Sequence, residues 1–89
     1  MIDQLTHMLF QLVKRYARAR KKAVQKGQLT PHDAAVLLDA YGEGIEHAMR
    51  VFLQEDMFQP NEAVDQLKAQ VIQALVDLDP AYVLGAKKT

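Results

Sequence analysis

The most distinctive chemistry in the sequence is a basic segment, KRYARARKKAVQK, at residues 14–26. It holds seven of the eleven Lys and Arg residues and no acidic residue, although the formal net charge of the chain is zero. Cations in such a run can bind nucleic-acid phosphates, lie against a membrane surface, or occupy the solvent-facing side of an amphipathic helix. The segment therefore has three possible roles, and the positions of its residues on a helix help to distinguish them.

A helical wheel at about 100° per residue, centred on Leu9, places most of these cations opposite the apolar stripe. The candidate nucleic-acid-binding residues are Lys14, Arg15, Arg18, Lys21 and Lys22. Solvation alone accounts for cations at such positions. Weak, sequence-nonspecific nucleic-acid binding is the alternative, although no aromatic residue shares this face to stack on bases. Membrane binding would require the apolar stripe, which is expected to pack inside the protein, so we expect no membrane partner.

Few other residues suggest a reactive site. Glu43 and His47 are four residues apart, so on a helix they share a face as metal ligands would. Both fall on the outer side of the predicted helix, and the residue three positions after Glu43 is Glu46, so the Glu-x-x-His motif of helical carboxylate metal sites is not present. The chain contains no cysteine and no serine, so it lacks the commonest nucleophiles and the thiolate metal ligands. We therefore expect no enzyme, no metal site and no cofactor.

Apolar residues spaced three and four apart predict a first helix from about residue 3 to 26. They are Ile2, Leu5, Leu9, Leu12, Tyr16, Ala19 and Ala23. This spacing is typical of helices that pack nearly parallel to their neighbours. Gly27 predicts a left-handed cap at the end of the helix. Arg20 lies close to the centre of the stripe, and we expect its guanidinium to extend toward solvent rather than to pair with Asp33, Asp39 or a dimer mate.

Two further helix starts follow. Thr30 and Pro31 predict a second helix that runs to about residue 55, with Thr30 as the N-cap and Pro31 in the first turn. A third, shorter helix begins near residues 60–62. It ends at Asp79, because the residue before a proline is disfavoured in helical geometry.

The remaining C-terminal residues are expected to form one short turn, at 80–84, ended by Gly85. The loops between the helices are short, so neighbouring helices are expected to be antiparallel. The predicted fold is all-α: an antiparallel three-helix bundle, made of a long helical hairpin, a shorter third helix and the C-terminal turn. It forms a single domain over residues 1–85, followed by a flexible basic tail at 86–89.

Two glycines interrupt the second helix, and each costs about 1 kcal/mol relative to alanine. Gly42 falls on the packed side of the helix, which predicts that another helix approaches closely there. Gly44 points away from that side. We therefore expect Gly42→Ala to destabilise the fold by overpacking.

Some apolar residues do not fit the stripes, and they are candidates for binding another protein. They are Phe10, Val36, Val51 and Phe58. The shorter third helix also leaves part of the long hairpin uncovered, which predicts a homodimer. No apolar run approaches the ~20 residues of a membrane span, and a cytoplasmic location is the default expectation. The sequence thus favours a small non-enzymatic protein-interaction module, an adaptor, regulator or inhibitor that binds another protein.

Overall fold

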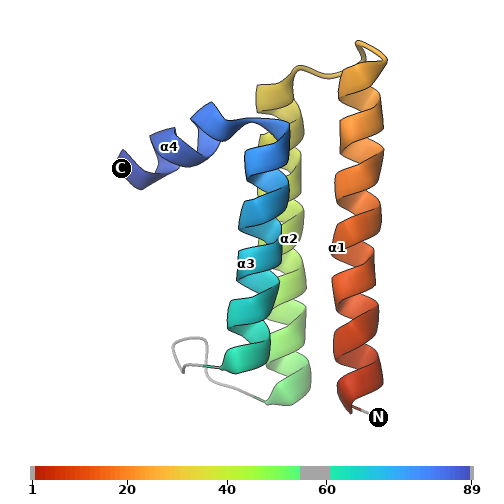
Figure 1. Cartoon of the computed structure of the whole chain (residues 1–89). Helices are drawn as coiled ribbons and strands as arrows, with labels where there is room; N and C mark the ends of the chain where they lie inside the picture. The colour runs from red at the N-terminus through yellow and green to blue at the C-terminus, as the bar shows by residue number, and fades with distance from the viewer. Residues whose placement is uncertain (1, 55–60, 89) are drawn as a thin grey trace.

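The computed structural model describes residues 2–54 and 61–88, with side chains for 4–54 and 61–85. Its helices are α1 (Ile2–Gln25), α2 (Pro31–Leu53), α3 (Glu62–Leu78) and α4 (Pro80–Lys88). Among the described residues there is no strand. Figure 1 shows α1, α2 and α3 running alternately up and down, with α4 turning away from the end of α3. The predicted all-α antiparallel bundle, a long hairpin with a shorter third helix, is confirmed.

The turn between α1 and α2 follows the local signals. Gly27 has a φ of 75°, the left-handed conformation that a C-terminal cap requires. Just beyond it, the Gln28 N–H donates to the carbonyl of Ala23 over 2.9 Å. Thr30 then caps α2, because its hydroxyl oxygen accepts from the Asp33 N–H at 3.1 Å. Both predicted boundaries are confirmed.

The other boundaries agree with the sequence in part. The Oδ1 atom of Asn61 accepts from the Val64 N–H at 3.1 Å, so Asn61 is the N-cap of α3. Asp79 ends α3 as expected before Pro80. The predicted stop at Gly85 is wrong, because α4 continues to Lys88. Glycine ends a helix by adopting the left-handed conformation, and Gly27 is the only described glycine that does so.

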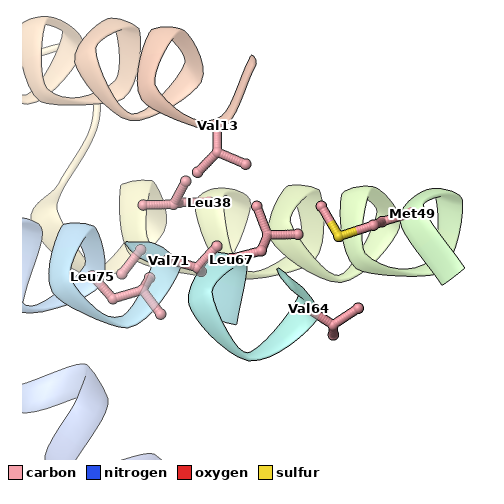
Figure 2. Packing of buried hydrophobic residues seen from close by; sticks show 8 residues of the cluster. Val13, Leu38, Met49, Val64, Leu67, Val71 and Leu75 are labelled. Atoms are coloured by element: carbon pink, nitrogen blue, oxygen red, sulfur yellow. The ribbon is translucent and has the colours of Figure 1, made fainter. Parts of the chain in front are cut away.

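The core lies where α1, α2 and α3 meet. Its buried residues are Val13, Ala35, Leu38, Met49, Val64, Leu67, Val71 and Leu75. In Figure 2, Val13 of α1 points toward Leu38 of α2, and the labelled α3 residues approach α2 from its other side. The helix α2 packs extensively against both neighbours, whereas α1 and α3 share a smaller contact. The bundle is therefore organised around α2.

The buried side of α1 differs from the one expected. Val13 is fully buried, whereas Leu12, a member of the predicted stripe, is 41% exposed. The cause is that α1 packs against two helices, so its buried side faces between α2 and α3. The periodicity of one helix reports an apolar stripe but does not say where its neighbours lie.

Gly42 allows α2 and α3 to approach closely, as predicted. A Cβ atom at this position would lie 2.9 and 3.0 Å from the two methyl carbons of Val71. At Gly44 an added Cβ would meet nothing within 4 Å. The glycine that the packing requires is therefore Gly42.

Candidate functional site

The surface that we consider the candidate site is the side of the hairpin α1–α2 that points away from α3. On α1, the carbonyl of Phe10 accepts a hydrogen bond from the Gln70 side chain of α3 at 3.2 Å, which marks the side facing α3. On α2, Gly42 marks the corresponding side by its contact with Val71. On helical wheels at about 100° per residue, the opposite side of the hairpin is made mainly of apolar and small residues, with Arg15 of α1 and Asp33 of α2 at its borders.

We name this surface the uncharged face. It consists of Leu5, Met8, Leu12, Tyr16, Ala19 and Ala23 on α1, and of Leu37, Tyr41, Gly44, Ala48, Val51 and Phe52 on α2. Several of its large side chains are open to water: Met8 is 59% exposed, Val51 is 77% exposed and Phe52 is 48% exposed. The described part of α4 packs elsewhere, since the Tyr82 hydroxyl donates to Asp39, which lies on the side of α2 near α3. The uncharged face is thus an exposed apolar surface.

Stacked aromatic rings join the two helices in the middle of the face. The rings of Tyr16 and Tyr41 lie 4.0 Å apart between centroids and are nearly parallel. The guanidinium of Arg20 covers Tyr16 at 4.9 Å from the ring centroid, a cation–π contact. The Nε atom of Arg20 is buried without a hydrogen-bond partner, so Arg20 is held against the ring rather than extended into solvent. In the described part of the chain it makes no ion pair with Asp33 or Asp39.

The four predicted protein-binding residues do not form one patch. Val36 and Val51 are exposed as expected, but fifteen residues of helix, about 22 Å, separate them. The expectation for Phe10 is wrong, because this side chain packs against the core. It does so because α1 is turned toward α3, which brings the side carrying Phe10 inward. Phe58 lies outside the described residues.

Some of the exposed apolar residues were expected in the core. Leu12 belongs to the predicted stripe of the first helix, yet it is 41% exposed, and Leu37 and Phe52 of α2 are also at least 39% exposed. The sequence feature that could have indicated their exposure is the width of the apolar stripes, because a wide stripe is not fully covered by the neighbouring helices of one chain.

All five candidate nucleic-acid-binding residues are exposed. Lys14, Arg18 and Lys21 line a groove of about 460 Å³ between α1 and α3. Arg15 and Lys22 do not line it. Within the described residues none of the five makes an ion pair. Their exposure agrees with the predicted solvent-facing side, and nucleic-acid binding by them stays a prediction.

The groove is not a uniformly basic surface. Its floor is apolar and made by Val13, Ala17, Ala74 and Leu78. The α3 wall contributes Gln70, Gln73 and Asp77, so a carboxylate faces the cations of α1. Phosphate groups would meet a hydrophobic floor and a negative charge here, both of which oppose nucleic-acid binding.

A second groove, of about 430 Å³, lies between α2 and α3. Glu43 and His47 both line it, beside Glu46. The Glu46 carboxylate is shared between two cations, the Nε of Arg50 at 3.5 Å and the Nζ of Lys68 at 3.7 Å. Among the described side chains no group of three or more potential ligands could hold a metal ion. The acidic residues of this groove are thus in part bound to cations of the same chain.

A polar contact fixes the start of α4. The Tyr82 hydroxyl donates to a carboxylate oxygen of Asp39 at 2.5 Å. This hydrogen bond, together with burial, raises the pKa of Tyr82 to about 12. The ring of His32 packs edge-on against Tyr82 with 5.7 Å between centroids, and its Nδ1 lies 4.0 Å from Asp79. These contacts hold α4 near α2 and are structural.

Comparison with known proteins assigns no family to this chain. No protein-family model, curated protein or solved structure matches the chain. None of the described helices is both long and apolar enough to cross a membrane. Of the surfaces found, the uncharged face is the one whose composition an isolated bundle does not explain.

Proposed function

We propose that this protein is a small non-enzymatic interaction module that binds another protein chain through the uncharged face. One observation carries the proposal: a hairpin of two long helices turns twelve uncharged residues away from the third helix. Among them, Met8, Leu12, Leu37, Val51 and Phe52 are each at least 39% exposed. The sequence, which lacks both cysteine and serine, supports the non-enzymatic part of the proposal.

The physical argument is the cost of leaving this surface in water. Burial of apolar area contributes about 25 cal/mol per Å², and contiguous exposed apolar patches of several hundred Å² mark interaction sites. Scattered exposed apolar residues need no explanation, but these residues lie together on two adjacent helices. The three-and-four spacing along α1 suits a helical partner that lies along the hairpin.

The proposal is tested by proximity labelling in the source organism with three forms of the full chain. Met8→Glu introduces a charge into the uncharged face. Val36→Glu makes the same kind of change at an exposed valine outside that face. We expect neighbours labelled by the wild type to be lost with Met8→Glu and retained with Val36→Glu. Identical sets of labelled proteins for all three forms would contradict the use of this face.

A second candidate function is nonspecific nucleic-acid binding by α1. The observation in its favour is that Lys14, Arg18 and Lys21 are exposed and make no ion pair within the described residues. It is tested by fluorescence anisotropy with labelled single-stranded and duplex DNA at about 50 mM salt, where phosphate contacts are strong. Binding that is lost on charge reversal of Lys14, Arg18 and Lys22 would favour this function. No binding at low salt would remove it.

A further inference from the structure

We infer that the occupant of the uncharged face is a second copy of this chain, in a dimer in which α1 packs antiparallel to α1 and α2 packs antiparallel to α2. The inference rests on the proposed function and names the partner for that surface. It is carried by the way side-chain size is distributed along the face.

Along α1, bulky residues lie at one end of the face and small residues lie at the other end. The stacked pair Tyr16–Tyr41 shows the relative register of the two antiparallel helices. Leu5 and Met8 therefore lie at the same end as Val51 and Phe52. The opposite end of α1 presents small side chains, Ala19 and Ala23. A single chain thus offers a protruding end and a recessed end.

Only one symmetric arrangement places these ends against each other. A two-fold axis that lies in the interface and runs across the helices brings the bulky end of α1 in each copy onto the small-residue end of α1 in the other. Met8 of one copy then lies opposite Ala19 of its partner, and Leu5 lies opposite Ala23. Such an interface is self-complementary, as closed dimers require. An axis parallel to the helices would instead set Leu5 and Met8 of one copy against Val51 and Phe52 of the other.

The size of the face also suits a dimer. The two helices have 24 and 23 residues, which corresponds to a length of about 36 Å at 1.5 Å per residue. Two helices side by side are about 20 Å wide, so the face covers on the order of 700 Å². A stable protein–protein interface buries about 800 Å² per partner. Two hairpins stacked in this way form a four-helix core, with α3 of each copy on the outside.

The charge pattern agrees with this arrangement. None of the twelve residues that define the face carries a formal charge; the nearest cation is Arg20, whose guanidinium lies over the Tyr16 ring. Arg15, at the edge of the face on α1, remains in water. The groove that holds Lys14, Arg18 and Lys21 lies on the α3 side and stays open in the dimer.

The first test is the mass of the purified full chain by light scattering after size exclusion, at tens of micromolar. We expect twice the 10.0 kDa of one chain for the wild type and for Val36→Glu, and the mass of one chain for Met8→Glu. A wild-type monomer, or dissociation by Val36→Glu as well, would overturn the inference. Helical content measured by circular dichroism shows whether the monomeric Met8→Glu chain is still folded.

The second test uses the absence of native cysteine to establish the antiparallel order. A disulfide needs Cα atoms within about 7 Å, whereas Met8 and Ala19 of one chain are about 16 Å apart along α1. Under mild oxidation we expect the double variant Met8→Cys/Ala19→Cys to form covalent dimers. Each single variant should remain uncrosslinked. Efficient crosslinking of Met8→Cys alone would show that bulky ends meet and would overturn the antiparallel arrangement.

The two proposals fail in different ways. If the wild type is monomeric but Met8→Glu still loses a neighbour in the labelling experiment, the second copy is wrong and the protein-binding function stands. If the chain is dimeric through another surface, Met8→Glu leaves the mass unchanged, and the assignment of the face is wrong.

Discussion

Replacement of Gly42 by alanine tests the closest contact between α2 and α3. The added Cβ would lie 2.9 and 3.0 Å from the two methyl carbons of Val71, well inside the 3.5–4.0 Å (roughly) that carbon atoms prefer. Val71 is 8% exposed and β-branched, so in a helix it is confined to essentially one rotamer. Its methyl groups cannot rotate away, and the two helices must separate locally.

Two opposing effects set the magnitude. Overpacking of this kind costs about 1–3 kcal/mol, whereas replacement of a mid-helix glycine by alanine contributes about 1 kcal/mol of helix propensity. Gly42→Ala should therefore destabilise the fold by about 0–2 kcal/mol in total. At Gly44 the added Cβ meets nothing within 4 Å, so Gly44→Ala should stabilise by about 1 kcal/mol. The difference between the two variants isolates the clash.

The assay is urea and thermal unfolding followed by circular dichroism. Both variants are made in the Met8→Glu background, so that self-association does not contribute to the difference. We expect the Tm of Gly42→Ala to lie below that of Gly44→Ala by at least about 4 °C, since 1 kcal/mol shifts a domain of this size by about 4–8 °C. Val71→Ala should recover much of the loss in the Gly42→Ala chain. Equal stability of the two glycine variants would refute the argument from close approach.

Two further predictions concern polar contacts. Tyr82→Phe removes the hydrogen bond to Asp39 and should cost about 1 kcal/mol at neutral pH. The pKa of Tyr82 is raised from 10.0 to about 12 in the folded chain. The stability difference between the wild type and this variant should therefore be constant below about pH 10 and disappear as the pH rises through about 12. Urea unfolding across this range measures the difference, and a value that does not change with pH would contradict the prediction. Glu46→Ala removes the carboxylate beside Arg50, which is 4% exposed, and should cost about 1.5–3 kcal/mol, the usual value of a polar contact to a charged group. Lys68 is a half-exposed partner of the same carboxylate, so Lys68→Ala should cost under about 1 kcal/mol. Equal losses of stability for Glu46→Ala and Lys68→Ala in urea unfolding would show that the burial of Arg50 does not matter.

The helix boundaries could be predicted because they depend on neighbouring residues alone. Thr30 caps α2 with its own hydroxyl, and Gly27 ends α1 because it adopts a positive φ. The geometry before Pro80 ends α3 whatever lies around it. The one wrong boundary, Gly85, shows the limit of the rule, since a glycine permits a left-handed cap but does not impose it.

The candidate site could be predicted only in part. The sequence correctly indicated that Val36 and Val51 are exposed. It placed Phe10 outside and Leu12 inside, and the structure has Phe10 against the core and Leu12 partly in water. The burial of Arg50 had no signal in the sequence, since arginine is mostly exposed.

The amino-acid order of this chain is sufficient to specify three helices, their ends and the close contact at Gly42, because capping, proline geometry and apolar spacing act over a few residues. The positions of the neighbouring helices determine which side of each helix is buried. An amphipathic helix has a stripe wider than one neighbour covers, and the position of α3 beside both α1 and α2 turns Val13 inward and leaves the uncharged face open. The surface available for partners is therefore a property of the packed bundle, since it is what remains of the apolar stripes after three helices have met.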